Sequence, residues 1–300
     1  MVVVIAVVLL TGSTGFVGAA ALRALLRRPG VEEIRAVVHR RPPTIGQLPR
    51  VRHVHADLTA PETLAGICDG VDTLIHLAGQ IGGSRQSCQA VNELGTAALL
   101  KEAQRSGVRR ILGLSTAAVY GEGVHRGLAE DEVAPRPVSP TSRSRLGAER
   151  LIHAAGGTIL RPMFITGAGD TWFLPTLLGL TEALNAWVDA GRALLSTIHV
   201  DELAEVIATL AGMPLPGGGV YHAADPCPRR VRDLIVRHST RPLPTADVSL
   251  TAAEQLLSAP FTSRQLRLLF SDHWYDSSKL WHALGGHPLR CQDFRRKVRR

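Results

Sequence analysis

Residues 11–18 have the sequence Thr11-Gly12-Ser13-Thr14-Gly15-Phe16-Val17-Gly18, and this glycine-rich stretch points to the architecture of the whole chain. It follows an aliphatic run without polar alternation, residues 2–10, which is typical of a parallel strand covered on both faces. It opens a segment of helical spacing, residues 16–28. In such a unit the three glycines permit a tight turn, the approach of a pyrophosphate and close helix–strand packing, and the helix N-terminus favours the anion. We therefore expect a dinucleotide to contact Thr11, Gly12, Thr14, Gly15, Phe16, Val17 and Gly18.

Strand-like and helix-like segments alternate along the first half of the chain. We predict strands at residues 2–10, 34–39, 51–56, 71–77, 109–115 and 158–160, with helices at residues 16–28, 86–107 and 140–155. This alternation predicts an α/β fold, a Rossmann doubly wound parallel sheet. Beyond residue 162 we predict a helix at 172–188, a strand at 196–200, a helix at 201–211, a strand at 220–223 and then short helices.

The end of the second predicted strand bears on the choice of cofactor. Proteins that bind NAD place an acidic residue there, which contacts the ribose hydroxyls. This sequence has His39-Arg40-Arg41 instead, and the planar, permanently charged guanidinium suits a 2′-phosphate. We therefore predict NADP(H), with Arg40 as the leading contact beside His39 and Arg41. The alternative is a solvated basic turn, because arginine is abundant in this chain.

The chain is predicted to divide into two parts. Residues 1–165 form an NADP(H)-binding Rossmann domain, to which a segment at about 196–223 returns, and residues 166–195 and 224–300 form a smaller C-terminal substrate-binding lobe. Trp172, Phe173 and Trp187 are expected to pack in a core, with an aromatic lid over the substrate as the alternative. His199 is expected to be structural, with a substrate contact as the alternative.

The composition is that of an ordinary globular protein, with 45% hydrophobic and 20% charged residues. The formal net charge of +8 is spread along the chain apart from a basic C-terminal tail, and this pattern does not favour a nucleic-acid partner. No apolar run approaches the ~18 residues of a membrane span, so we expect no membrane partner. The four cysteines include no Cys-x-x-Cys pair and the histidines no zinc-type spacing. We therefore expect free thiols, a cytoplasmic protein and no metal site.

Further motifs follow the glycine-rich stretch in order, and with them the chain resembles the extended short-chain dehydrogenase/reductases. The motifs are Asp57-Leu58, His76-Leu77-Ala78-Gly79, Asn92-x-x-Gly95-Thr96, Ser115-Thr116-Ala117-Ala118-Val119-Tyr120-Gly121, Arg161-Pro162 and Ile198-His199-Val200-Asp201. The resemblance implies that Asn92 braces the active-site helix and that Thr116, with Ser115 as a neighbouring candidate, binds the substrate oxygen. It also implies cofactor contacts from Asp57, Leu58, Leu77, Ala78, Gly79 and Pro162.

One departure from that family affects the chemistry. Members usually have Pro-Tyr-x-x-Ser-Lys at the start of the active-site helix, whereas here Thr141 stands in the place of the tyrosine and Arg145 in the place of the lysine. A tyrosine phenol can be tuned to donate a proton, but an aliphatic hydroxyl is far too weak an acid. Arginine keeps the positive charge and can hold ribose hydroxyls, but it does not relay protons. Tyr275 and Lys279 have the right spacing for a relocated pair, but they lie outside the motif's context.

We carry three functional hypotheses from the sequence. The first is an NADPH-dependent ketoreductase that reduces a carbonyl of a phenolic polyketide, angucyclinone-like, in antibiotic biosynthesis. The proton then comes from the substrate or water, because a phenol beside a carbonyl is an acid within hydrogen-bond distance. Two features favour this hypothesis: the replaced dyad, which resembles that of angucyclinone ketoreductases, and an arginine-rich composition typical of GC-rich genomes such as those of actinomycetes.

The other two hypotheses come from different classes of protein. One is a non-catalytic NADP(H)-binding sensor or regulatory protein, since both dyad residues are replaced. The other is a nucleotide-sugar epimerase or dehydratase, which the missing tyrosine base disfavours. The expected partner is a small-molecule substrate, and the chain is expected to be a monomer or a homodimer.

Overall fold

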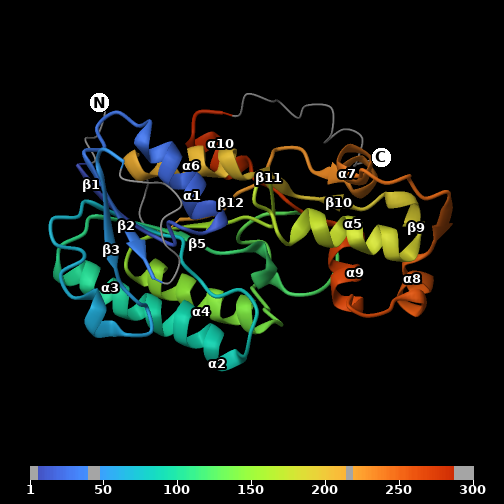
Figure 1. The fold of residues 1–300 in the computed structure, drawn as a ribbon, viewed down its shortest axis with the longest axis horizontal. Coiled ribbons are helices and arrows are strands. Elements are labelled where there is room, and N and C mark those ends of the chain that lie inside the picture. Colours follow the sequence, from blue (N-terminus) through green and yellow to red (C-terminus); the bar gives the residue numbers. More distant parts are fainter. Residues whose placement is uncertain (1–5, 40–47, 214–218, 287–300) are drawn as a thin grey trace.

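The computed structural model describes residues 6–39, 48–213 and 219–286, and its central element is a seven-stranded sheet (Figure 1). Neighbouring strands in this sheet are parallel throughout. From edge to edge the strands are β3 (Val51–His55), β2 (Glu33–Val38), β1 (Val7–Thr11), β4 (Thr73–His76), β5 (Arg110–Leu114), β7 (Thr158–Arg161) and β12 (Val220–His222). The predicted doubly wound Rossmann sheet is confirmed. The strand order reverses between β1 and β4, and ligands of such sheets bind at this point, at the carboxyl ends of the strands.

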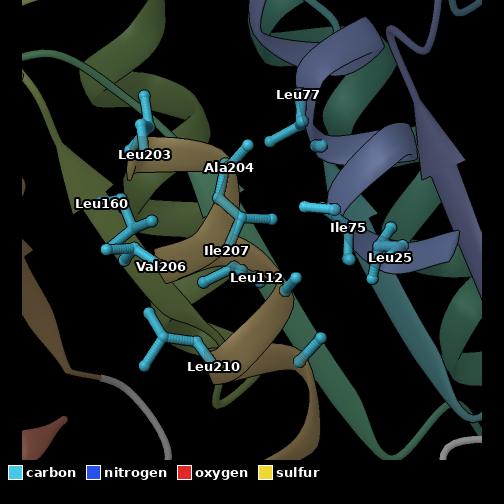
Figure 2. Packing of buried hydrophobic residues seen from close by; sticks show 14 of the residues in the cluster. Leu25, Ile75, Leu77, Leu112, Leu160, Leu203, Ala204, Val206, Ile207 and Leu210 are labelled. Carbon is cyan, nitrogen blue, oxygen red and sulfur yellow. The ribbon is translucent and has the colours of Figure 1, made fainter. Parts of the chain in front are cut away.

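Helices cover both faces of the sheet (Figure 1). One face carries α1 (Phe16–Leu26), α6 (Val200–Gly212) and α10 (Ser278–Ala283). The other face carries η1 (Pro61–Leu64), α2 (Arg85–Cys88), η2 (Gln89–Leu94), α3 (Gly95–Arg105) and α4 (Pro140–Ala154). Figure 2 shows Leu203, Ile207 and Leu210 of α6 beside Leu112 and Leu160 of the sheet, and all five are buried. Full burial of one such side chain is worth ~1.5–3 kcal/mol, so this apolar layer fixes α6 on the sheet.

A further group of helices gathers at the other end of the molecule (Figure 1). They are α5 (Phe173–Leu184), η4 (Asp189–Gly191), α7 (Val231–His238), α8 (Leu250–Leu256) and α9 (Ser263–Phe270). A second hydrophobic core lies among them, with Phe164, Phe173, Leu177 and Leu266 almost completely buried.

Short strands connect this end of the molecule. β8 (Phe164–Thr166) pairs with β11 (Thr197–His199), and β9 (Ala186–Val188) pairs with β14 (Ala246–Val248). A four-stranded sheet contains β13 (Arg229–Arg230), β10 (Leu194–Leu195), β15 (His273–Tyr275) and β6 (His125–Leu128).

Two secondary-structure predictions are wrong in this part of the chain. Residues 172–188 do not form one helix, because α5 ends at Leu184, Asn185 adopts a left-handed φ of 45° and β9 follows. Asparagine tolerates this conformation at a helix end, and β9 is stabilised by β14, which is remote in sequence. The last third of the chain also contains strands, and their partners are again remote, so the local pattern carried no signal for them.

The prediction of four free thiols is wrong, and among the described residues the exception is Cys227. Cys68 and Cys88 are free and buried, whereas Cys227 is disulfide-bonded. The prediction relied on spacing along the sequence, but disulfide pairing depends on distance in space. Among the described residues, no helix has both the length and the hydropathy needed to cross a membrane.

Candidate active site

The glycine-rich turn has the backbone geometry that its sequence predicts. Gly12 has a φ of 71°, and a Cβ there would lie 2.7 Å from the backbone nitrogen of Ala78. A Cβ on Gly18 would lie 1.9 Å from the Gly12 carbonyl oxygen, so α1 packs too closely on the glycine-rich turn for any side chain. A Cβ on Gly15 would meet, among the described residues, only that same oxygen at 3.3 Å. The space beside Gly15 is therefore available to a pyrophosphate, as the motif requires.

The other residues predicted for this turn lie around it. Thr14, Phe16 and Val17 are partly buried, and Phe16 and Val17 pack against the core under α1. Leu77 and Ala78 follow β4 at the same carboxyl edge of the sheet, and Leu77 is buried. Pro162 follows β7 at this edge, and its carbonyl oxygen accepts a hydrogen bond from the Ala117 amide.

A buried chain of hydrogen bonds joins β1, β4 and the start of α3. The Thr11 hydroxyl lies 2.7 Å from His76 Nδ1, and His76 Nε2 lies 2.9 Å from Thr96 Oγ1. Thr96 donates its own hydrogen to the Asn92 carbonyl oxygen, so it accepts from His76 Nε2, and His76 Nδ1 accepts from Thr11. Thr11 in turn accepts from the Ala78 amide. Burial, with a smaller effect from a nearby arginine, lowers the pKa of His76 to about 3, so the imidazole is neutral.

Asn92 links the loop after β4 to α4. It lies in η2, a π-helical segment that interrupts the predicted helix at residues 86–107. Its Oδ1 accepts from the Gln80 amide at 2.7 Å, and its Nδ2 donates to the Gln80 carbonyl oxygen at 3.0 Å and to Ser144 Oγ at 2.8 Å. Asn92 thus contacts the helix that the family resemblance assigned to it. Sequence reasoning missed Ser144 as its partner, and it missed the place of His76 between Thr11 and Thr96, although both are buried polar residues.

Thr141 holds a loop rather than projecting freely into the site. It lies in the first turn of α4, and its hydroxyl oxygen accepts from the Gly82 amide at 3.0 Å. The Cys88 thiol donates to the Gly82 carbonyl oxygen at 3.2 Å and lies 3.8 Å from the Thr141 hydroxyl. These contacts attach residues 79–83 to α4. An aliphatic hydroxyl in these contacts is no proton donor for a reduced carbonyl.

Arg145 lies one turn further along α4 and faces the ends of β4 and β5. Its Nη1 donates to the Leu114 carbonyl oxygen at 2.7 Å, and a Cβ on Gly79 would lie only 2.2 Å from its Nη2. The surrounding protein desolvates the guanidinium and lowers its pKa to about 10, with Cys88 and Glu149 opposing the shift. Arg145 is still a cation at neutral pH. It has no ion pair with a carboxylate within residues 6–39, 48–213 and 219–286, so its charge is available to a ligand.

Two hydroxyl groups follow β5 at the same edge. The Ser115 amide donates to the Leu160 carbonyl oxygen at 2.8 Å, but the buried Ser115 Oγ has no hydrogen-bond partner among the described residues. Thr116 Oγ1 accepts from the Ala118 amide at 3.1 Å and caps η3 (Ala117–Tyr120). Each hydroxyl therefore keeps a hydrogen that it can donate to a carbonyl oxygen.

A buried ion pair joins the end of β7 to α4. Arg161 forms a two-pronged contact with Glu149, at 2.9 Å from Nε to Oε1 and 2.5 Å from Nη2 to Oε2. Its Nη1 donates to the Tyr120 hydroxyl at 2.8 Å, and that hydroxyl lies 2.7 Å from His222 Nε2. Burial raises the pKa of Tyr120 to about 12 and lowers that of His222 to about 4. Tyr120 is therefore no substitute for the missing acid.

The relocated pair considered from the sequence is engaged elsewhere. The Tyr275 hydroxyl lies 2.8 Å from His125 Nδ1, and burial raises the pKa of this tyrosine well above its usual value. The Lys279 ammonium donates to the Val220 carbonyl oxygen and lies 5.0 Å from the Tyr221 ring centroid. The spacing of Tyr275 and Lys279 therefore does not make them a Tyr–Lys dyad.

An ion pair joins the ends of β2 and β3, where we expect the adenosine of the cofactor to bind. His39 Nε2 lies 2.9 Å from Asp57 Oδ2, and hydrogen bonds from Thr59, followed by the effect of His39, lower the pKa of Asp57. A Cβ on Gly95 would lie 2.7 Å from Leu58 Cβ, so α3 begins in close contact with this loop. Arg40 and Arg41 lie outside the described residues, and their cofactor contacts stay predictions.

Comparison with known proteins identifies the family of the chain. The sequence profile of the "NAD dependent epimerase/dehydratase family" matches residues 8–224. The chain belongs to this family. Members of this family are extended short-chain dehydrogenase/reductases, which are oxidoreductases that use a nicotinamide dinucleotide. The geometry of the glycine-rich turn is compatible with such a cofactor.

The relatives of this chain include reductases. It is 33% identical over 242 residues to the 4-hydroxy-2-methyl-3-oxo-4-farnesyl-3,4-dihydroquinoline-1-oxide ketoreductase of Stigmatella aurantiaca, covering 75% of this chain and 70% of that protein. It is 28% identical to a 2-alkyl-3-oxoalkanoate reductase of Stenotrophomonas maltophilia, covering 76% and 73%. Two further relatives match over 55% and 48% of their own length.

Solved structures agree on the fold of the family. The Bordetella bronchiseptica enzyme WbmH, determined in complex with NAD+, superposes with a TM-score of 0.74 at 17% identity, covering 95% of this chain and 94% of that one. At this identity the likeness concerns the fold alone.

Proposed function

We propose that this oxidoreductase is an NADPH-dependent ketoreductase that reduces a carbonyl of a phenolic polyketide, angucyclinone-like, in antibiotic biosynthesis. The reaction type is supported by the likeness to a quinoline ketoreductase and a 3-oxoalkanoate reductase. The site residues are Ser115, Thr116, Thr141 and Arg145, all at the carboxyl edge of the sheet or on the first two turns of α4.

One observation carries the mechanistic part of the proposal: the place of the usual acid holds a threonine hydroxyl. The Thr141 hydroxyl accepts from the Gly82 amide, and Arg145, a cation at neutral pH, donates to the Leu114 carbonyl oxygen. An aliphatic hydroxyl is too weak an acid to take the place of the tyrosine, and Arg145 keeps its proton to hold the charge that develops on the substrate oxygen. The proton that completes the alcohol therefore comes from the substrate or from water.

The chain's own groups then have distinct parts in the reduction. When bound, NADPH supplies the hydride that adds to the carbonyl carbon. Thr116, with Ser115 as a second candidate, donates a hydrogen bond to the carbonyl oxygen, and Arg145 stabilises the negative charge that develops there. A phenol next to the carbonyl transfers its proton to that oxygen, and the resulting phenolate regains a proton from water. Thr141 positions the loop of residues 79–83.

The preference for NADPH rests on the end of β2. The sequence after β2, His39-Arg40-Arg41, has no acidic residue at the usual position for the ribose hydroxyls, and the Asp57 carboxylate that lies beside His39 is paired with it. We expect Arg40→Ala to raise the KM for NADPH at least tenfold while leaving the KM for NADH nearly unchanged, since a charged phosphate contact is worth ~1.5–3 kcal/mol.

The decisive experiment compares paired substrates. NADPH oxidation is followed with aromatic polyketide ketones that carry a phenol beside the carbonyl, and with their O-methyl ethers. We expect turnover of the phenols, and rates lower by about 10²–10⁴ for the ethers, because general acid catalysis contributes a factor of this size. Equal rates for both would refute substrate-assisted protonation.

The same experiment separates the other two functions. Binding of NADPH without turnover of any ketone favours the non-catalytic sensor, for which the replaced dyad is the motivating observation. Tightly retained NAD after purification favours a nucleotide-sugar epimerase or dehydratase.

A further inference from the structure

Trp172 is an exposed aromatic residue set on a buried aromatic stack. Its side chain is 43% exposed, whereas Trp187 is 5% exposed. The Trp172 ring is nearly parallel to that of Phe164, at 9° with centroids 6.4 Å apart, and Phe164 stacks on Phe173 at 4.4 Å. Phe164 and Phe173 are fully buried, whereas the neighbouring Trp172 keeps part of its surface open to solvent.

Chain connections place this stack beside the candidate active site. Phe164 follows Pro162 by two residues, and the Pro162 carbonyl oxygen accepts from Ala117, the residue after Thr116. The segment leading to Trp172 also reaches the glycine-rich turn.

Two glycines make that second connection. A Cβ on Gly169 would lie 3.2 Å from the Phe16 ring, and a Cβ on Gly167 would lie 2.9 Å from His199 Nε2. The loop before Trp172 therefore runs in close contact with both the dinucleotide motif and the start of α6.

Charge at the start of α5 disfavours an anionic ligand. The Asp170 carboxylate accepts hydrogen bonds from the amides of Trp172 and Phe173 through Oδ1, at 2.9 and 2.8 Å, and from Leu174 through Oδ2, at 2.8 Å. Free amides at a helix N-terminus are the groups that bind phosphate, and here a carboxylate already uses them. A second negative group beside Asp170 would be repelled.

We propose that Trp172 determines substrate specificity by stacking on a planar, uncharged aromatic ring system, and that Asp170 excludes phosphorylated or nucleotide-linked substrates from the same place. The proposal deepens the proposed function, on which it rests for the identity of the ring that carries the ketone. It is a statement about binding, so it is tested without turnover.

The test measures ligand affinity by calorimetry in the presence of NADP+, which prevents reduction. The probes are 1-hydroxyanthraquinone, a saturated bicyclic ketone (decalone) and UDP-glucose. The variants are Trp172→Leu, Trp172→Phe and, as the matched buried control, Trp187→Phe. We expect Trp172→Leu to weaken binding of the anthraquinone about fivefold to tenfold, and Trp172→Phe and Trp187→Phe to change it less than twofold.

The other probes check the class of ligand. Decalone affinity should not respond to Trp172→Leu, and UDP-glucose should bind more weakly than the anthraquinone. An unchanged anthraquinone affinity in a folded Trp172→Leu protein would overturn the proposal, and so would tighter binding of UDP-glucose. If stacking depends on Trp172 while no ketone is reduced, the proposed function fails and this inference stands.

Discussion

Replacing Glu149 with leucine leaves the Arg161 guanidinium buried without its counter-ion. The two side chains are 4% and 6% exposed, and both prongs of their contact are within hydrogen-bond distance. Burial by itself lowers the pKa of Arg161, but Glu149 outweighs it and the net shift is upward, so the guanidinium is charged. Removing one partner of such a pair typically costs ~3–5 kcal/mol. In a protein of this size that corresponds to a decrease in Tm of roughly 5–8 °C.

Urea and thermal unfolding followed by circular dichroism measure this loss. The control is Glu122→Leu, because Glu122 and Arg264 form an exposed pair at 3.6 Å, which is worth less than ~1 kcal/mol. The double variant Glu149→Leu/Arg161→Met should regain most of the loss, since apolar side chains of similar volume replace a buried pair at little cost. The reasoning fails if Glu149→Leu unfolds within ~1 kcal/mol of the native protein, or if the double variant is no more stable than the single one.

Three further outcomes are expected. Thr141→Val removes the acceptor of the Gly82 amide, a hydrogen bond worth ~0.5–1.5 kcal/mol. Steady-state kinetics should therefore show the KM for the ketone raised roughly twofold to twelvefold with kcat little changed, and Thr141→Ser should behave as the native enzyme. A collapse of kcat would give Thr141 a chemical role. The pKa values of His76 and His222 are lowered in the folded protein, so their contribution to the free energy of unfolding is fully present above about pH 6.5. As the pH drops towards 4, the free energy of unfolding should fall by ~1.4 kcal/mol per pH unit for each histidine. Urea midpoints that stay constant between pH 7 and pH 5 would contradict this. Gly18→Ala should destabilise the fold by ~1–3 kcal/mol or more, whereas Gly15→Ala should destabilise it less but bind NADPH weakly, as thermal unfolding and cofactor titration would show.

The sequence was informative wherever the deciding contacts are local. The glycine-rich turn, the apolar strand before it and the helix after it are consecutive in the chain, and their order was sufficient to predict the parallel sheet. The capping box of Ser139 and Ser142, with Pro140 at the first helical position, likewise marks the start of α4. Such signals survive because turn and cap geometry depends on the φ and ψ angles of adjacent residues.

Prediction failed where a remote segment decides the conformation. The apolar residues after Asn185 suit a helix, but β9 forms because β14 offers backbone partners to it. The roles of His76 and Ser144 depend on hydrogen bonds to residues of other elements. No spacing along the chain encodes these distances.

The sequence by itself determined the fold, the dinucleotide motif and the replacement of the tyrosine and lysine by Thr141 and Arg145. Only the tertiary structure decided what the replacements do: it binds the Thr141 hydroxyl to Gly82 and leaves the Arg145 charge without a carboxylate partner among the described residues. The physical reason is that residue type fixes which bonds a side chain is able to form, whereas the packing of distant segments fixes which partners are within reach.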